Sequence, residues 1–141
     1  MEILVVEDDD DLRELEVTIV KAAGHTPIEA ANGAEAIKEF EDSDCSVVIL
    51  DWMLPDFSGI DVATTFQSIR YAYVIMVTAL GKKEHAEEAL RAGVGDYLEK
   101  PFEPEEFIEC MGVAEAIVTA RERLAKRLEK LGVNMEAVEA V

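Results

Sequence analysis

The chain has 141 residues, half of them hydrophobic, which suffices for one domain with a sizeable core. Its 31 acidic residues outnumber 13 basic ones, and a net charge of −18 disfavours direct binding to nucleic acid or to anionic lipid. The sequence has no apolar run long enough to span a membrane, no leader-like start and only two, widely separated cysteines, so we expect a cytoplasmic protein with reduced thiols.

Apolar runs rich in β-branched residues alternate with stretches of helical period. Strands are predicted at 3–6, 26–30, 47–50, 74–77 and 96–99. The strongest runs lack polar alternation, which is typical of strands buried on both faces. Strict alternation with short connections predicts a parallel sheet covered by helices on both sides. The expected fold is α/β, a flavodoxin-like doubly wound sheet of five parallel strands in the order 2-1-3-4-5, with five helices.

Each helix is expected to turn its apolar residues toward the sheet. In the first helix these residues are Leu12, Leu15, Ile19 and Ala22. In the fourth helix they are Ala86, Ala89 and Leu90. The acidic run Asp9, Asp10 and Asp11 is interpreted as the capped first turn of a helix, since acidic side chains favour that position.

The last helix, which starts after Pro104, is predicted to be unusually long. A heptad-like stripe of mostly apolar residues advances along it in steps of three and four residues, which is the coiled-coil period. The stripe comprises Phe107, Cys110, Ala114, Ile117, Arg121, Leu124, Leu128 and Leu131. Gly132 is the expected stop. We therefore predict a domain over 1–118 and a C-terminal extension over 119–141, a coiled-coil-like stem or linker suited to a homodimer.

Polar residues follow the predicted strands where parallel strands end together. Glu7 and Asp8 follow the first strand, Asp51 the third, Thr78 the fourth and Lys100 the fifth. Ligands bind at this edge of an open α/β sheet, and carboxylates gathered there repel one another unless a cation compensates. Ligands with oxygen donors alone suit Mg²⁺, while a lysine offers a point charge for phosphoryl oxygens. The set predicts a site that places a phosphoryl group on a carboxylate.

Four segments together resemble the response-regulator receiver domain of two-component signal transduction, in the CheY-like superfamily. They are EILVVED at 2–8, DWMLPDFSG at 51–59, VTA at 77–79 and YLEKPF at 97–102. Any one of these segments is weak evidence for the family, but all four together, in order and at the family's spacing, are specific for it. The resemblance covers about residues 2–118 and implies a phosphorylation-controlled signalling module rather than an enzyme. Its implied partners are a sensor histidine kinase or phosphotransfer protein and an output partner or domain.

Residue by residue, the resemblance implies a metal-assisted phosphoryl transfer. Asp51 would accept the phosphoryl group from a kinase phosphohistidine. Asp8 and Asp51 would bind Mg²⁺ directly, together with the backbone carbonyl of Met53, and Glu7 would act through a water molecule. Lys100 would contact a phosphoryl oxygen.

The resemblance also implies a conformational switch. Thr78 would move its hydroxyl onto the phosphoryl group, and Tyr97 would turn inward into the vacated space. A cis peptide bond would precede Pro101. The departures from the family pattern are mild: Glu7 stands where some members carry Asp, and the bulky Trp52 and Met53 beside the acceptor are expected to slow the access of water.

The sequence disfavours two alternatives to a receiver. A HAD-type phosphatase also uses an Asp nucleophile with Mg²⁺, but it needs a second Asp two residues later as general acid, and Met53 occupies that position. A pseudo-receiver scaffold is disfavoured by the intact Asp51, Thr78 and Lys100. Asp56 is interpreted as a solvated loop residue.

Overall fold

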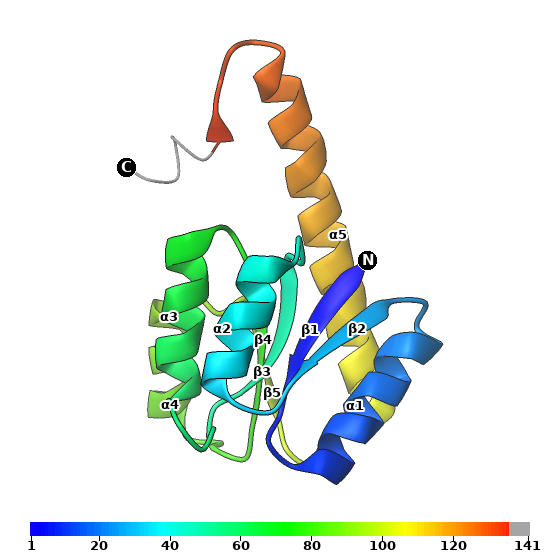
Figure 1. Cartoon of the computed structure of the whole chain (residues 1–141), viewed down its shortest axis with the longest axis vertical. Coiled ribbons are helices and arrows are strands. Elements are labelled where there is room, and N and C mark those ends of the chain that lie inside the picture. The colour runs from blue at the N-terminus through cyan, green and yellow to red at the C-terminus, as the bar shows by residue number, and fades with distance from the viewer. Residues whose placement is uncertain (136–141) are drawn as a thin grey trace.

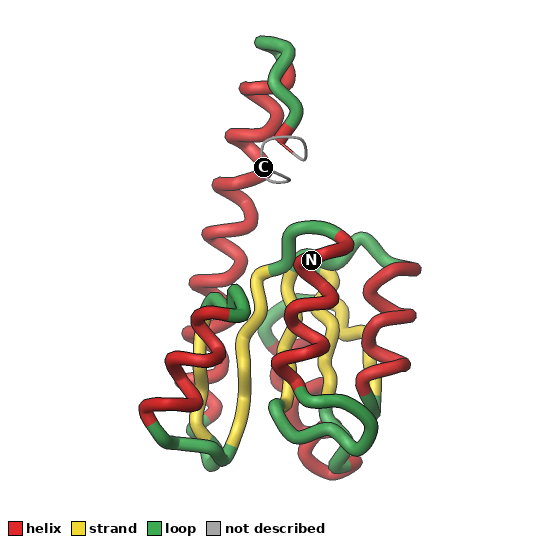
Figure 2. The backbone as a smooth tube through the Cα atoms, turned by 90° about the vertical axis from the view of Figure 1, so that its left-hand side faces the viewer, coloured by secondary structure: helices red, strands yellow, loops and turns green. Residues whose placement is uncertain are grey.

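The computed structural model describes residues 1–135 and contains a five-stranded parallel sheet in the order β2-β1-β3-β4-β5 (Figures 1 and 2). The strands are β1 (Glu2–Val6), β2 (Thr26–Ala30), β3 (Val47–Asp51), β4 (Tyr73–Thr78) and β5 (Asp96–Glu99). The helices are α1 (Asp10–Ala22), α2 (Gly33–Asp42), α3 (Gly59–Ile69), α4 (Lys83–Arg91) and α5 (Pro104–Glu129). The predicted fold class and strand order are confirmed.

Two apolar layers flank the sheet. Helices α2, α3 and α4 cover one face, and helices α1 and α5 cover the other (Figure 2). Successive residues of β1 and β3 point to opposite layers, as the period of a strand requires: Leu4 and Val48 join one core, whereas Ile3 and Val47 join the other. Because β3 and β4 are buried along their whole length, the residues at their ends are held on a rigid support.

Helix α1 is rotated relative to the face predicted from its apolar residues. Leu15 is 47% exposed, whereas the neighbouring Glu16 is only 1% exposed. The helix is aligned from its start, because Asp9 caps it by accepting from the backbone N–H of Leu12 at 3.0 Å. In α4, Ala89 is buried as predicted but Leu90 is exposed. Local apolar spacing was therefore right about Ile19 and Ala89 and wrong about Leu15 and Leu90.

Helix α5 carries two apolar stripes instead of the single one predicted. The stripe that packs on the sheet consists of Phe107, Met111, Ala114 and Val118. The second stripe faces solvent, and its members Ile117, Leu124 and Leu131 are 41%, 46% and 78% exposed. The solvent-facing residues 117, 124 and 131 repeat every seven residues, and the buried residues 111 and 118 form a second seven-residue series that lies one residue further along. Because consecutive residues of a helix point in different directions, the two series form two stripes.

The second half of α5 projects beyond the sheet, at the end opposite to the one where the strands finish (Figure 1). The chain stops being helical near Gly132, whose φ of +81° lets the N–H of Val133 donate to the carbonyl of Leu128 at 3.0 Å, as predicted for a glycine stop. The predicted extension continues to residue 141, and its part 136–141 lies outside the described residues. Within residues 1–135, no helix combines the length and apolarity that a membrane span requires.

Candidate functional site

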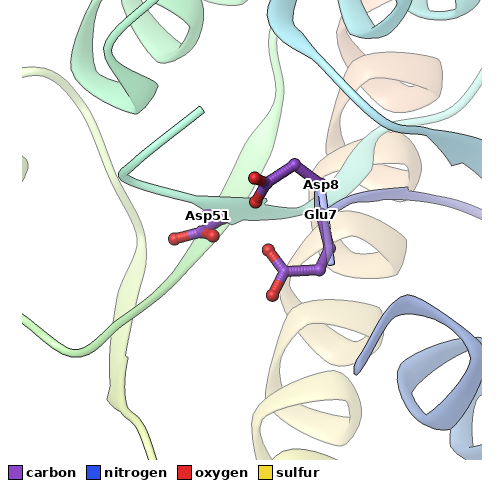
Figure 3. A group of neighbouring side chains, drawn as sticks. All are labelled: Glu7, Asp8 and Asp51. Carbon is purple, nitrogen blue, oxygen red and sulfur yellow. The ribbon is translucent and has the colours of Figure 1, made fainter. Parts of the chain in front are cut away.

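Three carboxyl groups converge where β1 and β3 end. Glu7 and Asp8 follow β1, Asp51 closes β3, and one oxygen from each lies within 4.8 Å of the others. Figure 3 shows the three side chains directed toward a common space. They meet because β1 and β3 are parallel neighbours paired from Ile3 with Val47 onward. Glu7 and Asp51 are buried, whereas Asp8 is exposed.

Lys100 is the cation that the structure places among these carboxylates. Its Nζ lies 2.8 Å from Oε1 of Glu7 and 3.2 Å from Oδ2 of Asp51. The Lys100 backbone N–H donates to the carbonyl of Thr78 at 2.8 Å, so the residue continues the pairing of β5 with β4. The peptide bond between Lys100 and Pro101 is cis, as predicted.

The electrostatics of the site show a shortage of positive charge. Burial, reinforced by the adjacent Asp51 carboxyl, outweighs the effect of Lys100 and raises the pKa of Glu7 to about 8. Burial also disfavours the Lys100 ammonium, but its hydrogen bond to Glu7 and the charge of Asp51 prevail and raise the pKa of Lys100. One ammonium therefore does not neutralise three carboxyl groups held this closely.

The donor set fits a hard divalent cation such as Mg²⁺. All three side chains offer carboxylate oxygens, which are the ligands that Mg²⁺ takes from proteins. The Oε2 atom of Glu7 is buried and has no hydrogen-bond partner in the described part of the chain. A buried carboxylate oxygen without a partner is costly, and a cation or its bound water would satisfy it.

Thr78 and Tyr97 are joined through the backbone of Leu80. The Leu80 N–H donates to Oγ1 of Thr78 at 3.1 Å, and the Leu80 carbonyl accepts from the hydroxyl of Tyr97. Thr78 is buried at the end of β4, one residue beyond the pairing of Asp51 with Val77. Tyr97 is half-buried against the core under α4. Thr78 and Tyr97, which the sequence singled out, therefore both bond to the backbone of Leu80. Sequence reasoning missed Leu80.

The residues that follow Asp51 differ in exposure. Trp52 is buried in the core, where its ring makes a T-shaped contact with the ring of His85 of α4. The expectation that Trp52 and Met53 slow the access of water to Asp51 stays a prediction. Met53 is 64% exposed, and its backbone N–H donates to Oδ1 of Asp51 at 3.2 Å, which orients the carboxyl group.

Arg13 is a second residue near the site that sequence reasoning missed. Its guanidinium donates to the backbone carbonyl of Glu7 at 2.8 Å and forms ion pairs with Asp10 and Glu29. The side chain thus ties the loop after β1 to α1 and β2. The contact with a backbone carbonyl leaves no mark in the residue pattern, so only the structure identifies it.

Asp56 is exposed in the loop after β3, as interpreted from the sequence, and it also caps α2. Its carboxylate accepts from the backbone N–H of Gly33 at 2.8 Å and from that of Ala34 at 2.9 Å. Desolvation opposes ionisation, but these bonds and one from Phe57 outweigh it and lower the pKa of Asp56. The cap joins Asp56 to residues that lie 23 and 22 positions earlier in the chain, and sequence spacing does not reveal a contact at such a separation.

Comparison with known proteins gives consistent results. A sequence profile of the response regulator receiver domain matches residues 3–111. The chain is 36% identical over 107 residues to the transcriptional regulatory protein SrrA of Staphylococcus aureus (strain NCTC 8325 / PS 47). That match covers 76% of this chain but 44% of the relative, so the chain spans less than half of the length of SrrA.

Solved structures share the fold. The receiver domain of the Francisella response regulator 1452 superposes with a TM-score of 0.79 at 28% identity, covering 83% of this chain and 98% of that one. NtrX from Brucella abortus, solved in complex with ADP, gives a TM-score of 0.84 at 26% identity, covering 94% of this chain and 30% of NtrX.

Proposed function

The chain belongs to the response regulator receiver domain family of two-component signalling, and from this premise we propose that Asp51 accepts a phosphoryl group from a phosphohistidine. The donor would be a sensor histidine kinase or a phosphotransfer protein. The observation that carries the proposal is the placement of Asp51: its carboxyl group closes a fully buried strand beside Glu7 and Asp8 and lies 3.2 Å from the Lys100 ammonium.

In the proposed transfer, an Asp51 carboxylate oxygen forms a bond to phosphorus while the bond between phosphorus and the histidine nitrogen breaks. The Met53 N–H holds the other Asp51 oxygen, so one oxygen can be directed at the donor. Lys100 lies close enough to Asp51 to meet a phosphoryl oxygen. Asp8, Asp51 and the Met53 carbonyl, with Glu7 through a water molecule, would hold Mg²⁺. When bound, Mg²⁺ offsets the negative charge on the phosphoryl oxygens.

The proposed signal leaves the site through Thr78 and Tyr97. A phosphoryl group on Asp51 would attract the Thr78 hydroxyl, which now accepts from the Leu80 N–H. Leu80 also holds the Tyr97 hydroxyl, so a shift of Thr78 is transmitted to Tyr97 through one residue. The added charge would thereby bias the loop before α4 between two arrangements.

The proposed organisation is a cytoplasmic receiver over 1–118 followed by a stem or linker over 119–141. The solvent-facing stripe of α5, formed by Ile117, Leu124 and Leu131, supports a homodimer through this helix. It equally suits packing against an output domain, since the matched regulator SrrA is longer than this chain.

Phosphorylation of purified protein tests the proposed function. With Mg²⁺ and acetyl phosphate, the wild type should gain one phosphoryl group that hydroxylamine removes, as expected for an acyl phosphate. Asp51→Asn should abolish the gain, because an amide is not a nucleophile. The matched control is Asp61→Asn on the exposed surface of α3, which should be modified normally. Intact-protein mass spectrometry measures all three, and a phosphoryl group retained on Asp51→Asn would contradict the assignment.

A further inference from the structure

Glu16 is a carboxyl group for which the proposed phosphoryl transfer gives no role. It lies on the buried face of α1 and is 1% exposed. Its Oε2 atom is buried and finds no hydrogen-bond partner within residues 1–135. Burying a carboxyl group without a partner costs free energy. The adjacent Leu15 is 47% exposed, so α1 buries an acidic side chain and leaves the neighbouring apolar one in solvent.

The charged groups that act on Glu16 belong to the phosphoryl site. Burial is the main cause that raises the pKa of Glu16 to about 8; the Lys100 ammonium opposes this rise and the Asp51 carboxylate adds to it. Helix α1 contacts both β1, which carries Glu7 at its end, and α5, which follows Lys100 along the chain. Glu16 is therefore a buried carboxyl group on the sheet-facing side of α1, within the electrostatic reach of Lys100 and Asp51.

Within residues 1–135, Lys100 donates to two side-chain acceptors. An ammonium group has three N–H donors, and those of Lys100 reach Oε1 of Glu7 and Oδ2 of Asp51. Both acceptors belong to the group of carboxylates that fits a divalent cation. A cation bound there would withdraw negative charge from the two acceptors and repel the ammonium, so Lys100, whose side chain is 21% exposed, would turn to solvent or to another acceptor within the protein.

We propose that Glu16 is a positioning residue that receives the Lys100 ammonium when Glu7 and Asp51 engage a divalent cation. This inference rests on the proposed function and adds a residue to it. Glu16 retains Lys100 beside the site instead of releasing it to solvent, and it relieves the repulsion between ammonium and cation. By holding Lys100 close, it also keeps the ammonium available for a phosphoryl oxygen on Asp51.

The test compares Mg²⁺ affinity in matched variants. Trp52, the single tryptophan of the sequence, adjoins Asp51 and provides a fluorescence signal for titration with MgCl₂. Glu16→Gln should raise the Mg²⁺ Kd by about fivefold or more, a coupling of the size found between contacting groups. Glu14→Gln makes the same substitution on the exposed face of α1 and should stay within about twofold of wild type when both variants are titrated above pH 8, where Glu16 is ionised.

A double-mutant cycle with Lys100→Met separates positioning from a general field effect. If Glu16 acts through Lys100, adding Glu16→Gln to Lys100→Met should change the Kd little. A penalty that persists in full without Lys100 would overturn the proposal, and so would a Glu16→Gln protein that binds Mg²⁺ as wild type does. If the wild type itself binds no Mg²⁺, the proposed function fails as well, so the two failures are distinguishable.

Two further measurements address a purely structural role for Glu16. In the presence of EDTA, Glu16→Gln should unfold in urea at a concentration no lower than wild type, because the substitution removes a buried acid. Addition of Mg²⁺ should shift the ¹⁵Nζ resonance of Lys100 in wild type and shift it less in Glu16→Gln. If Glu16→Gln fails to fold, Glu16→Leu provides an apolar side chain of similar size for the same titrations. A Lys100 resonance that responds equally in wild type and variant would overturn the proposal.

Discussion

Glu7 shows how burial and neighbouring charge act on one residue of the site. It is 1% exposed, it accepts from Lys100 at 2.8 Å, and its second oxygen has no partner in the part of the chain described. The Arg13 guanidinium donates to the Glu7 backbone carbonyl, which attaches the loop after β1 to α1. Such a carboxyl group is retained against its own desolvation cost, which is typical of functional sites.

The raised pKa of Glu7 predicts that metal-free protein loses stability as pH rises. Between the ordinary value of 4.5 and about 8, folded Glu7 holds a proton that the unfolded chain releases. The unfolding free energy should therefore fall across this window, by at most about 1.4 kcal/mol per pH unit for each such group. Glu7→Gln with Asp8→Asn should weaken the slope and raise stability at pH 8 in EDTA, measured by urea unfolding. Lower stability of this double variant at pH 8 would contradict the account.

Lys100 should matter for the response to phosphorylation more than for cation binding. Lys100→Ala removes the ammonium that lies 3.2 Å from Asp51 but leaves the three carboxyl groups in place. Mg²⁺ should still bind, since removing a competing cation does not remove a ligand. After addition of beryllofluoride, the amide shifts of Thr78, Leu80 and Tyr97 should change much less than in wild type. Shift changes equal to those of wild type would show that Lys100 has no such role.

Among the elements, the loop after β3 does more than connect a strand to a helix. Its Asp56 carboxylate accepts the N–H groups of Gly33 and Ala34 at the start of α2, where Asn32 supplies a second, local cap to Glu35. The loop that follows Asp51 is thereby attached to α2 on one side and to α3 on the other. This attachment holds the backbone that follows Asp51.

The Asp56 cap predicts a contribution to stability that is lost in acid. Because its folded pKa is lowered, Asp56 stabilises the fold above the ordinary pKa of an aspartate, and this contribution disappears as pH falls through the folded value. Asp56→Ala should lower the Tm at neutral pH and accelerate hydrogen exchange of the Gly33 and Ala34 amides. Asp61→Ala in the first turn of α3 is the control for loss of an exposed acid and should not accelerate exchange of the Gly33 and Ala34 amides. Unchanged exchange in Asp56→Ala would remove the cap from the account.

At the scale of the whole molecule, charge is distributed unevenly. The chain carries a net charge of −18, yet residues 119–131 contain five basic and two acidic side chains. Helix α5 carries this basic segment away from the sheet, at the end opposite to the carboxyl site (Figure 1). The acidic body and the basic stem are thus spatially separate, so the stem offers a surface unlike that of the domain it leaves.

The exposed stripe of α5 predicts self-association. Ile117, Leu124 and Leu131 would each contribute about 1.5–3 kcal/mol if a second helix buried them fully. Sedimentation of the full chain at tens of micromolar should show a dimer, whereas a chain ending at Val118 should be monomeric. Leu124→Glu in the full chain should also favour the monomer while leaving the sheet-packing stripe intact. Equal monomeric masses for all three proteins, with and without beryllofluoride, would exclude pairing through this helix.

The sequence alone determined the β/α order, the strand order and the meeting of Glu7, Asp8 and Asp51, because parallel strands bring their ends to one edge wherever the chain alternates regularly. It could not determine the rotation of α1 about its axis, so it predicted a buried Leu15 where the structure buries Glu16. It also missed Arg13, Leu80 and Asp56, whose partners are backbone groups or lie far along the chain. Residue patterns report average burial, whereas hydrogen bonds to the backbone and the rotation of a helix depend on the packed structure.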